Sequence, residues 1–464
     1  MKFAARWPKG FMTARTINIE ALQRAQDLQR DKKWTEAIPL WREHLEFDPQ
    51  DAAVWFNLGA ALQATADSPA DRYAAAECYQ KVLTCPGVEM DTKAHAMSNL
   101  GVMMLKVGHH AKATICFNLA TQIDPTNAAA RVNLGDALRY EGKYDAADAE
   151  FEAVLKLDPE SHGAKFSSGM IKLLLGDLEE GFRLYESRHF VDSFPAKLFI
   201  TDVPSWNGED LDGKTLLVTQ EQGYGDTFQM VRYCAELKNQ WPDCRIIFRG
   251  DAALKNIILT ADGVDAFVTD ASEVAYDYHV PTMSLPFRMG TTLASIPSAV
   301  PYIGTGGAGI ISDEKLEAGS FNVALVWAGS PRHGRDEFRS FEPELFQPLV
   351  DAHPECSFYS LQCGPRADEV AKLRNVTDLA PIISDWTHTA QALHQLDLLI
   401  TVDTAIAHLA GALSCNVWML TPHSPDWRWL LGRSDSPWYP TMRLFRQERE
   451  GGWQGVIKQI SKAL

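Results

Sequence analysis

The chain has 464 residues, of which 46% are apolar and 22% are charged, a composition typical of folded globular proteins. Because this length exceeds what one hydrophobic core usually holds, we expect about three domains. The formal net charge of −16 argues against nucleic-acid binding, since neutralising phosphates requires a basic face.

The cysteines and the N-terminal residues indicate a compartment. The eight cysteines include no C-x-x-C pair, and most lie in apolar runs, which predicts reduced, buried thiols. Residues 1–16 are basic but contain no continuous apolar stretch, so we expect a disordered lead-in rather than a signal peptide. No apolar run approaches the roughly 20 residues that cross a bilayer. These features predict a cytoplasmic protein without membrane insertion.

A pattern with a period of 34 residues runs through residues 17–195. Asn-Leu-Gly at 99–101 and at 133–135 recurs as Ser-Ser-Gly at 167–169, and aromatic residues repeat at Phe117, Phe151 and Tyr185. This pattern resembles the tetratricopeptide repeat, in which small residues let paired helices approach and aromatic residues fill the layer between them. We expect about five units stacked into a superhelix with a concave surface.

Three asparagines share one repeat position, on the first helix of successive units: Asn57, Asn99 and Asn133. In tetratricopeptide superhelices this position faces the groove, where amides can hydrogen-bond the backbone of an extended peptide without reading its sequence. The alternative is that asparagine is common there and only caps or solvates the helix. The first interpretation makes these residues candidates for binding a protein partner.

From Lys214 the pattern changes to short β-branched runs that alternate with helical stretches, which indicates parallel sheets. We expect strands of one unit at 215–220, 244–250, 266–270 and 276–281, and strands of a second at 322–329, 357–362, 396–403 and 416–422. The join between the two lies in a Gly- and Pro-rich stretch, which places one Rossmann-like half at 196–308 and another at 309–464. Ligands bind such sheets beyond the carboxyl ends of the strands.

The segment EQGYGDTFQMVRY, residues 221–233, follows the first predicted strand. Gly223 and Gly225 permit a tight turn from strand to helix with a close backbone approach. Asp226 is then either a helix cap or a base that takes a proton from a hydroxyl group, a role that burial would favour by raising its basicity.

Two strand ends of the second half carry anion-binding features. The loop WAGSPRHGRDEFRS, residues 327–340, contains four basic residues and can neutralise a diphosphate, or can be a solvated basic loop. The strand ending at Asp403 runs into a helix whose free N–H groups form an anion site. Asp403 can accept bonds from sugar hydroxyls and His408 can face phosphates; alternatively, Asp403 is a cap and His408 a core histidine.

Together these three motifs resemble the heptosyltransferase-type GT-B glycosyltransferases, and their fusion to repeats is similar to protein O-GlcNAc transferases. The overall plan is similar to bacterial repeat-fused glycosyltransferases, including those that modify flagellin, and the tail HSPDWRWLLGRSDSPWYPTMRLFRQ also resembles that group. The resemblance implies a GT-B module of two Rossmann-like domains after the tetratricopeptide superhelix. It implies Asp226 as the general base and a donor-binding set made of Gly223, Gly225, Ser330, Arg335, Arg339, Asp403, Thr404, Ala405 and His408.

The activity that the resemblance implies is inverting transfer of a sugar from a nucleotide-sugar donor to a Ser/Thr hydroxyl of a protein acceptor, flagellin among the acceptors expected. Arg339 stands where heptosyltransferases have a lysine, which leaves the donor open. His279 lies at a strand end of the first half and is a candidate for the acceptor side. No metal site and no cofactor are expected, because the D-x-D at 210–212 reads as a solvated turn. Two rival hypotheses stay open: a non-catalytic repeat scaffold or chaperone, and a transferase that acts on a glycan.

Overall fold

The protein's structure, a computed structural model, describes residues 9–191, 194, 199–312, 316, 319–334 and 336–464. Contacts divide the chain into two compact units, Met1–Ser168 and Gly169–Leu464. The first is helical, and the second contains two parallel sheets.

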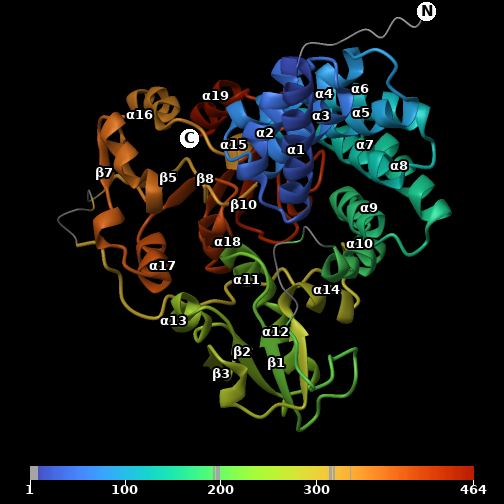
Figure 1. The fold of residues 1–464 in the computed structure, drawn as a ribbon. Coiled ribbons are helices and arrows are strands. Elements are labelled where there is room, and N and C mark those ends of the chain that lie inside the picture. Colours follow the sequence, from blue (N-terminus) through green and yellow to red (C-terminus); the bar gives the residue numbers. More distant parts are fainter. Residues whose placement is uncertain (1–8, 192–193, 195–198, 313–315, 317–318, 335) are drawn as a thin grey trace, which may run out of the picture. The chain divides into compact units, whose positions relative to one another are not determined.

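The first unit consists of helices that pack as consecutive pairs, as Figure 1 shows for α3 with α4, α5 with α6 and α7 with α8. The bounds are α1 Lys9–Arg30, α2 Trp34–Phe47, α3 Ala52–Ala64, α4 Pro69–Thr84, α5 Met90–Lys106, α6 His110–Ile123, α7 Ala128–Tyr140 and α8 Tyr144–Leu157. Helix α1 thus begins within the segment 1–16 that we expected to be disordered, while residues 1–8 lie outside the described part. The next helix, α9 His162–Leu175, crosses the boundary between the units.

The 34-residue pattern is explained by contacts between small and aromatic residues. A methyl group added at Gly101 in α5 would lie 2.7 Å from a ring carbon of Phe117 in α6. Gly135 and Phe151 repeat this contact between α7 and α8, and both phenylalanine rings are fully buried. Because only glycine leaves room for the ring, the two helices of each pair lie close together. The predicted tetratricopeptide helix pairs are confirmed.

In the second unit, the end of α9 is followed by α10 Leu178–Tyr185 and the 3₁₀ helix η1 Glu186–Phe190. Its first sheet has the parallel order β3-β2-β1-β4, with β1 Thr215–Thr219, β2 Arg245–Arg249, β3 Ala266–Val268 and β4 Tyr278–Pro281. The second sheet has the parallel order β10-β9-β8-β5-β6-β7, with β5 Phe321–Val326, β6 Cys356–Ser360, β7 Val376–Asp378, β8 Leu398–Val402, β9 Val417–Thr421 and β10 Met442–Arg446.

Helices connect these strands, as parallel pairing requires. In the first half they are α11 Tyr224–Met230, α12 Tyr233–Gln240, α13 Lys255–Ile258 and α14 Leu285–Arg288. In the second half they are α15 Asp336–Arg339, α16 Gln347–Ala352, α17 Trp386–His394, α18 Ala405–Ala412 and α19 Trp453–Ala463. In both sheets the strand order reverses beside the first strand, between β1 and β4 and between β5 and β8, which is the arrangement of doubly wound folds.

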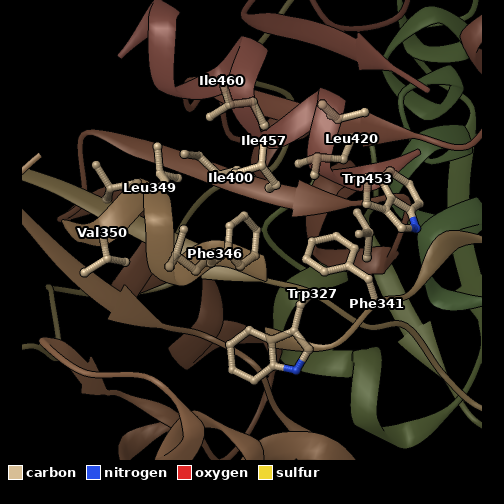
Figure 2. Packing of buried hydrophobic residues seen from close by; sticks show 14 of the residues in the cluster. Trp327, Phe341, Phe346, Leu349, Val350, Ile400, Leu420, Trp453, Ile457 and Ile460 are labelled. Atoms are coloured by element: carbon tan, nitrogen blue, oxygen red, sulfur yellow. The ribbon is translucent and has the colours of Figure 1, made fainter. Parts of the chain in front are cut away.

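A large apolar cluster holds the second sheet to its covering helices (Figure 2). Ile400 of β8 and Leu420 of β9 pack with Ile457 and Ile460 of α19, all nearly or fully buried. Phe341 joins this cluster to the loop after β5, since its ring centroid lies 5.2 Å from that of Trp453. The loop that follows β5 is therefore anchored in the core.

Eight of the ten strands found in the described residues overlap the predicted stretches, and β7 and β10 were missed. β7 has only three residues, and β10 has the sequence Met-Arg-Leu-Phe-Arg, whose arginines mask its apolar character. Both strands lie at the edges of the second sheet, where a strand pairs with only one neighbouring strand. The predicted division at 308/309 falls between the two sheets, whereas contacts assign part of the fifth helix pair to the second unit.

Candidate functional site

The predicted donor-binding loops lie at the point where the strand order of the second sheet reverses. The loop 327–340 follows β5, Asp403 and Thr404 follow β8, and these two strands are neighbours in the sheet. In doubly wound sheets the crevice beyond the strand ends at this point is the usual ligand site. The topology therefore brings together Ser330, Arg339 and the residues 403–405, as the sequence predicts.

Asp226 lies in the first turn of α11, directly after the loop that leaves β1. Its Oδ2 accepts a hydrogen bond of 2.7 Å from the backbone N–H of Gly223, the residue that precedes the helix. Its Oδ1 accepts a hydrogen bond from Nη2 of Arg428. Asp226 thus helps to cap α11 and, at the same time, presents its other oxygen to the second half.

Arg428 comes from the C-terminal tail, in the 3₁₀ helix η8 Trp427–Trp429, and its side chain is 7% exposed. Besides Asp226 it binds Oδ1 of Asp426 at 2.8 Å through Nη1 and Oε1 of Gln229 at 2.6 Å through Nε. The sequence of this tail resembles repeat-fused glycosyltransferases, but its pattern did not predict a role for Arg428. The sequence Asp-Trp-Arg-Trp is the signal that could have identified Arg428. It places an arginine between two tryptophans and two residues after an aspartate.

The carboxylates around Arg428 have shifted pKa values. Burial raises the pKa of Asp226, while the nearby Arg428 opposes this rise. Burial and the charge of Asp426 raise the pKa of Asp403, whereas Arg428 and its hydrogen bonds keep the pKa of Asp426 low against burial. The charge of Arg339 opposes the rise in the pKa of Asp403.

The starts of α11 and α18 are in contact. A methyl group added at Gly225 would lie 2.9 Å from Cδ2 of His408 and 3.3 Å from Cα of Ala405. The two helices pack extensively, although α11 follows the first sheet and α18 the second. Gly225 is therefore required for the close approach of the two halves at this site.

Arg339 connects the two loops of the second half. Its Nε donates to Oδ1 of Asp336 at 3.0 Å and its Nη1 donates to the backbone carbonyl of Asp403 at 2.7 Å. Gly329 lets the guanidinium pass close to the backbone, because a side chain there would collide with it. The exposed Ser330 lies in the turn before, and Arg335, the other predicted cation of this loop, lies outside the described residues.

Thr404 is the residue before α18 and makes no side-chain capping hydrogen bond. The N–H groups of the first turn, beginning at Ala405, are therefore not capped by it and suit an anion. Asp403 is 15% exposed, and its Oδ1 lies 4.0 Å from Nε2 of His408. Anion binding at this helix start stays a prediction.

The position of His408 requires a correction. Its side chain is 6% exposed, its Nδ1 hydrogen-bonds the Tyr439 hydroxyl at 2.9 Å, and its ring stacks on Trp429. Burial, helped by Arg428, lowers its pKa to about 3, so the ring is neutral. A neutral, enclosed imidazole cannot supply charge to a phosphate, and His408 is the core histidine that the sequence left as the alternative.

The candidate acceptor residues lie on helices of the repeats and on a strand of the first sheet. Asn57, Asn99 and Asn133 are half-buried on α3, α5 and α7, and Asn57 Oδ1 accepts a hydrogen bond of 3.1 Å from Gln29. His279, in β4, is buried, with its Nε2 3.1 Å from Oγ of Ser205. Its enclosure beside Ser205 and Phe199 favours a structural part over contact with an acceptor.

Three side chains of the repeat unit have potential metal-ligand atoms within 4.8 Å of one another: His44, Asp48 and Asp51. Asp51 caps α3 through two backbone N–H groups and also binds His44 at 3.0 Å, so capping accounts for this cluster.

All eight cysteines are unpaired thiols, of which Cys363 is exposed. In the described part of the chain we find no helix that is both long and apolar enough to traverse a bilayer.

Comparison with known proteins identifies the repeats. The family described as Tetratricopeptide repeat matches residues 132–188. Protein FlbA of Caulobacter vibrioides is 26% identical over 399 residues, covering 79% of this chain and 66% of FlbA, so the chain spans just under two thirds of that relative. The N-terminal region therefore consists of tetratricopeptide repeats, a module typical of protein-interaction scaffolds.

Solved structures similar to this chain include MamA 41-end from Desulfovibrio magneticus RS-1, with 19% identity and a TM-score of 0.33, covering 38% of this chain and 97% of that one. Another is YrrB, described as a TPR protein with an unusual peptide-binding site, with 21% identity and a TM-score of 0.32, covering 39% and 90%.

Proposed function

We propose that this protein is a GT-B glycosyltransferase that moves a sugar from a nucleotide-sugar donor to a Ser/Thr hydroxyl of a protein acceptor held by the repeats. The observation that carries the proposal is the contact between the strand-end sites of the two sheets. Asp226, from the helix after β1, binds Arg428, and Gly225 packs on the start of α18, which follows β8. This contact supports the proposal because it joins the helix that follows β1 to the start of the helix that follows β8.

The proposed reaction is a direct displacement with inversion. The acceptor oxygen bonds to the anomeric carbon as the bond from that carbon to the donor phosphate breaks, and the hydroxyl proton passes to Asp226. The pKa of Asp226, raised by burial, suits a proton acceptor. Arg428, Arg339 and the N–H groups at the start of α18 stabilise the departing phosphate, and the scheme needs no metal.

Arg428 gives the site a switch between two partners. It binds both Asp226 and Asp426, so one oxygen of the base is occupied. A diphosphate offers a guanidinium stronger, bidentate hydrogen bonds. Donor binding then withdraws Arg428 from Asp226 and frees its Oδ1 to accept the proton.

The repeat unit supplies the acceptor site in this proposal. Asn57, Asn99 and Asn133 repeat along successive first helices and can hydrogen-bond an extended peptide backbone. Flagellin is the acceptor that the sequence resemblance suggests. A non-catalytic scaffold is the second candidate, favoured by one observation: the pairing of Asp226 with Arg428 occupies the base.

A nucleotide-sugar screen separates the two functions. Thermal shift with UDP-N-acetylglucosamine, GDP-mannose and CMP-N-acetylneuraminate tests binding, and turnover assays with the stabilising donor test transfer. The transferase proposal predicts that a donor stabilises the native protein and is turned over by it. Both effects should be lost in Arg428→Gln. Stabilisation without turnover would favour the scaffold, and absence of any donor effect would contradict the transferase.

A further inference from the structure

A cavity lies at the carboxyl end of the first sheet, and none of the residues assigned to sugar transfer lines it. It has a volume of about 310 Å³ and is lined by His189, Phe199, Ile200, Thr219, Gln220, Glu221, Arg249 and Pro281. Thr219, Arg249 and Pro281 are the last residues of β1, β2 and β4, and β1 and β4 flank the point where the strand order of this sheet reverses. The cavity therefore occupies the usual ligand position of a doubly wound sheet.

Arg249 gives this cavity a positive charge. Its Nε is buried without a hydrogen-bond partner. Its charge lowers the pKa of Asp270, which does not line the cavity. Its guanidinium carbon lies 4.7 Å from the ring centroid of Phe199, which supports the cation without neutralising it. A buried donor that lacks a partner costs free energy, which a bound acceptor would recover.

The other ionisable groups of the lining do not supply that acceptor. Glu221 is held by Arg188 through two hydrogen bonds, at 2.7 and 2.8 Å, so its charge is already balanced. Burial and the charge of Arg188 lower the pKa of His189, which favours the neutral imidazole. Among the lining residues, Arg249 is therefore the charged group available to pair with an anionic ligand.

The rest of the lining selects the ligand's shape. Phe199, Ile200 and Pro281 form an apolar side, and Ile200 is 89% exposed. We propose that this cavity binds a carboxylate attached to an apolar group, with the carboxylate on Arg249 and the apolar group against Phe199 and Ile200. This site is independent of Asp226 and Arg428.

Ligand-observed NMR with N-acetylphenylalaninate and its neutral amide tests the proposal on the full chain. We expect saturable binding of the carboxylate with a Kd of about 1 mM or tighter, and at least about tenfold weaker binding of the amide. Arg249→Gln should abolish this preference. Arg443→Gln is the matched control, because Arg443 also lies 4.7 Å from a phenylalanine ring, that of Phe445, outside the cavity.

Several results would overturn the proposal: no saturable binding, equal binding of acid and amide, or an unchanged preference in Arg249→Gln. Tighter binding of inorganic phosphate than of the carboxylate would overturn the choice of ligand class. If Arg249→Gln unfolds, Arg249→Lys replaces it as the test. That variant keeps the charge and should keep the preference for the acid, and loss of the preference in a folded Arg249→Lys would also contradict the proposal.

Discussion

The carboxylate of Asp226 accepts a hydrogen bond from the guanidinium of Arg428, which lies 202 residues later in the chain. Asp226 belongs to the helix after the first strand of the first sheet, and Arg428 belongs to the tail beyond β9. Since Arg428 also binds Asp426 and Gln229, it is shared among groups from both halves. Arg428 therefore links α11 of the first half to the C-terminal tail of the second.

Removing Arg428 should destabilise the second unit. Arg428→Gln leaves the carboxylates of Asp226 and Asp426 largely enclosed without their cation, which we expect to cost about 3–5 kcal/mol of unfolding free energy. Urea unfolding followed by tryptophan fluorescence measures this loss. The control is Arg433→Gln, whose ion pair with Asp435 is more exposed and should contribute about 1 kcal/mol or less. Equal losses of unfolding free energy in the two variants would show that the ion pairs of Arg428 stabilise the unit no more than an exposed pair does.

Adding a methyl group at Gly225 should separate α11 from α18. Gly225→Ala brings the new carbon to 2.9 Å from His408 and 3.3 Å from the backbone of Ala405, and overpacking of this kind costs about 1–3 kcal/mol. We expect a lower melting temperature and reduced donor binding. Gly455→Ala in α19 is the control, since nothing lies within 4 Å of the added methyl group. A Gly225→Ala protein as stable as this control would show that the contact is not required.

The buried His408 predicts a pH dependence of stability. Its pKa is about 3 in the folded chain against an ordinary 6.5, so between these values the unfolded chain binds a proton that the folded chain does not. The contribution of His408 to the unfolding free energy should therefore be fully present above pH about 6.5. It should fall as the pH drops towards about 3, by up to about 1.4 kcal/mol per pH unit. The raised pKa values of Asp226 and Asp403 act in the opposite direction.

Comparison of variants isolates this contribution. Urea unfolding at a series of pH values should give a shallower loss of stability in His408→Gln than in the native chain. Parallel slopes in the native chain and His408→Gln would contradict the buried, neutral state of His408.

The repeat asparagines should affect the acceptor and not the donor. Replacing Asn57, Asn99 and Asn133 together with alanine removes amides that contribute about 1 kcal/mol each if they bind a peptide backbone. We expect the KM for flagellin to rise by about tenfold or more, with donor hydrolysis unchanged. Asn118→Ala, on the second helix of its pair, is the control. An unaltered KM in the triple variant would argue against the asparagine ladder.

The sequence predicted what depends on local pattern. The recurrence of Gly101 with Phe117 indicated the helix pairs because the same small-to-aromatic contact repeats, and the glycines around Asp226 marked a strand-to-helix turn. Partners across the chain could not be read in this way: the contact of Arg339 with the carbonyl of Asp403, and that of Arg428 with Asp226, depend on how loops after different strands meet. Likewise, no local signal distinguishes the enclosed His408 from a ligand-binding histidine.

The most direct test of the proposed function is the intact mass of flagellin after incubation with the stabilising donor and either the native protein or Asp226→Asn. The substitution keeps the side chain's size but removes the proton acceptor, so we expect donor binding to persist and the rate of mass gain to fall by about a hundredfold to ten-thousandfold. Asp210→Asn, in the exposed turn before β1, should transfer at the native rate. Transfer by Asp226→Asn at the native rate would contradict the account.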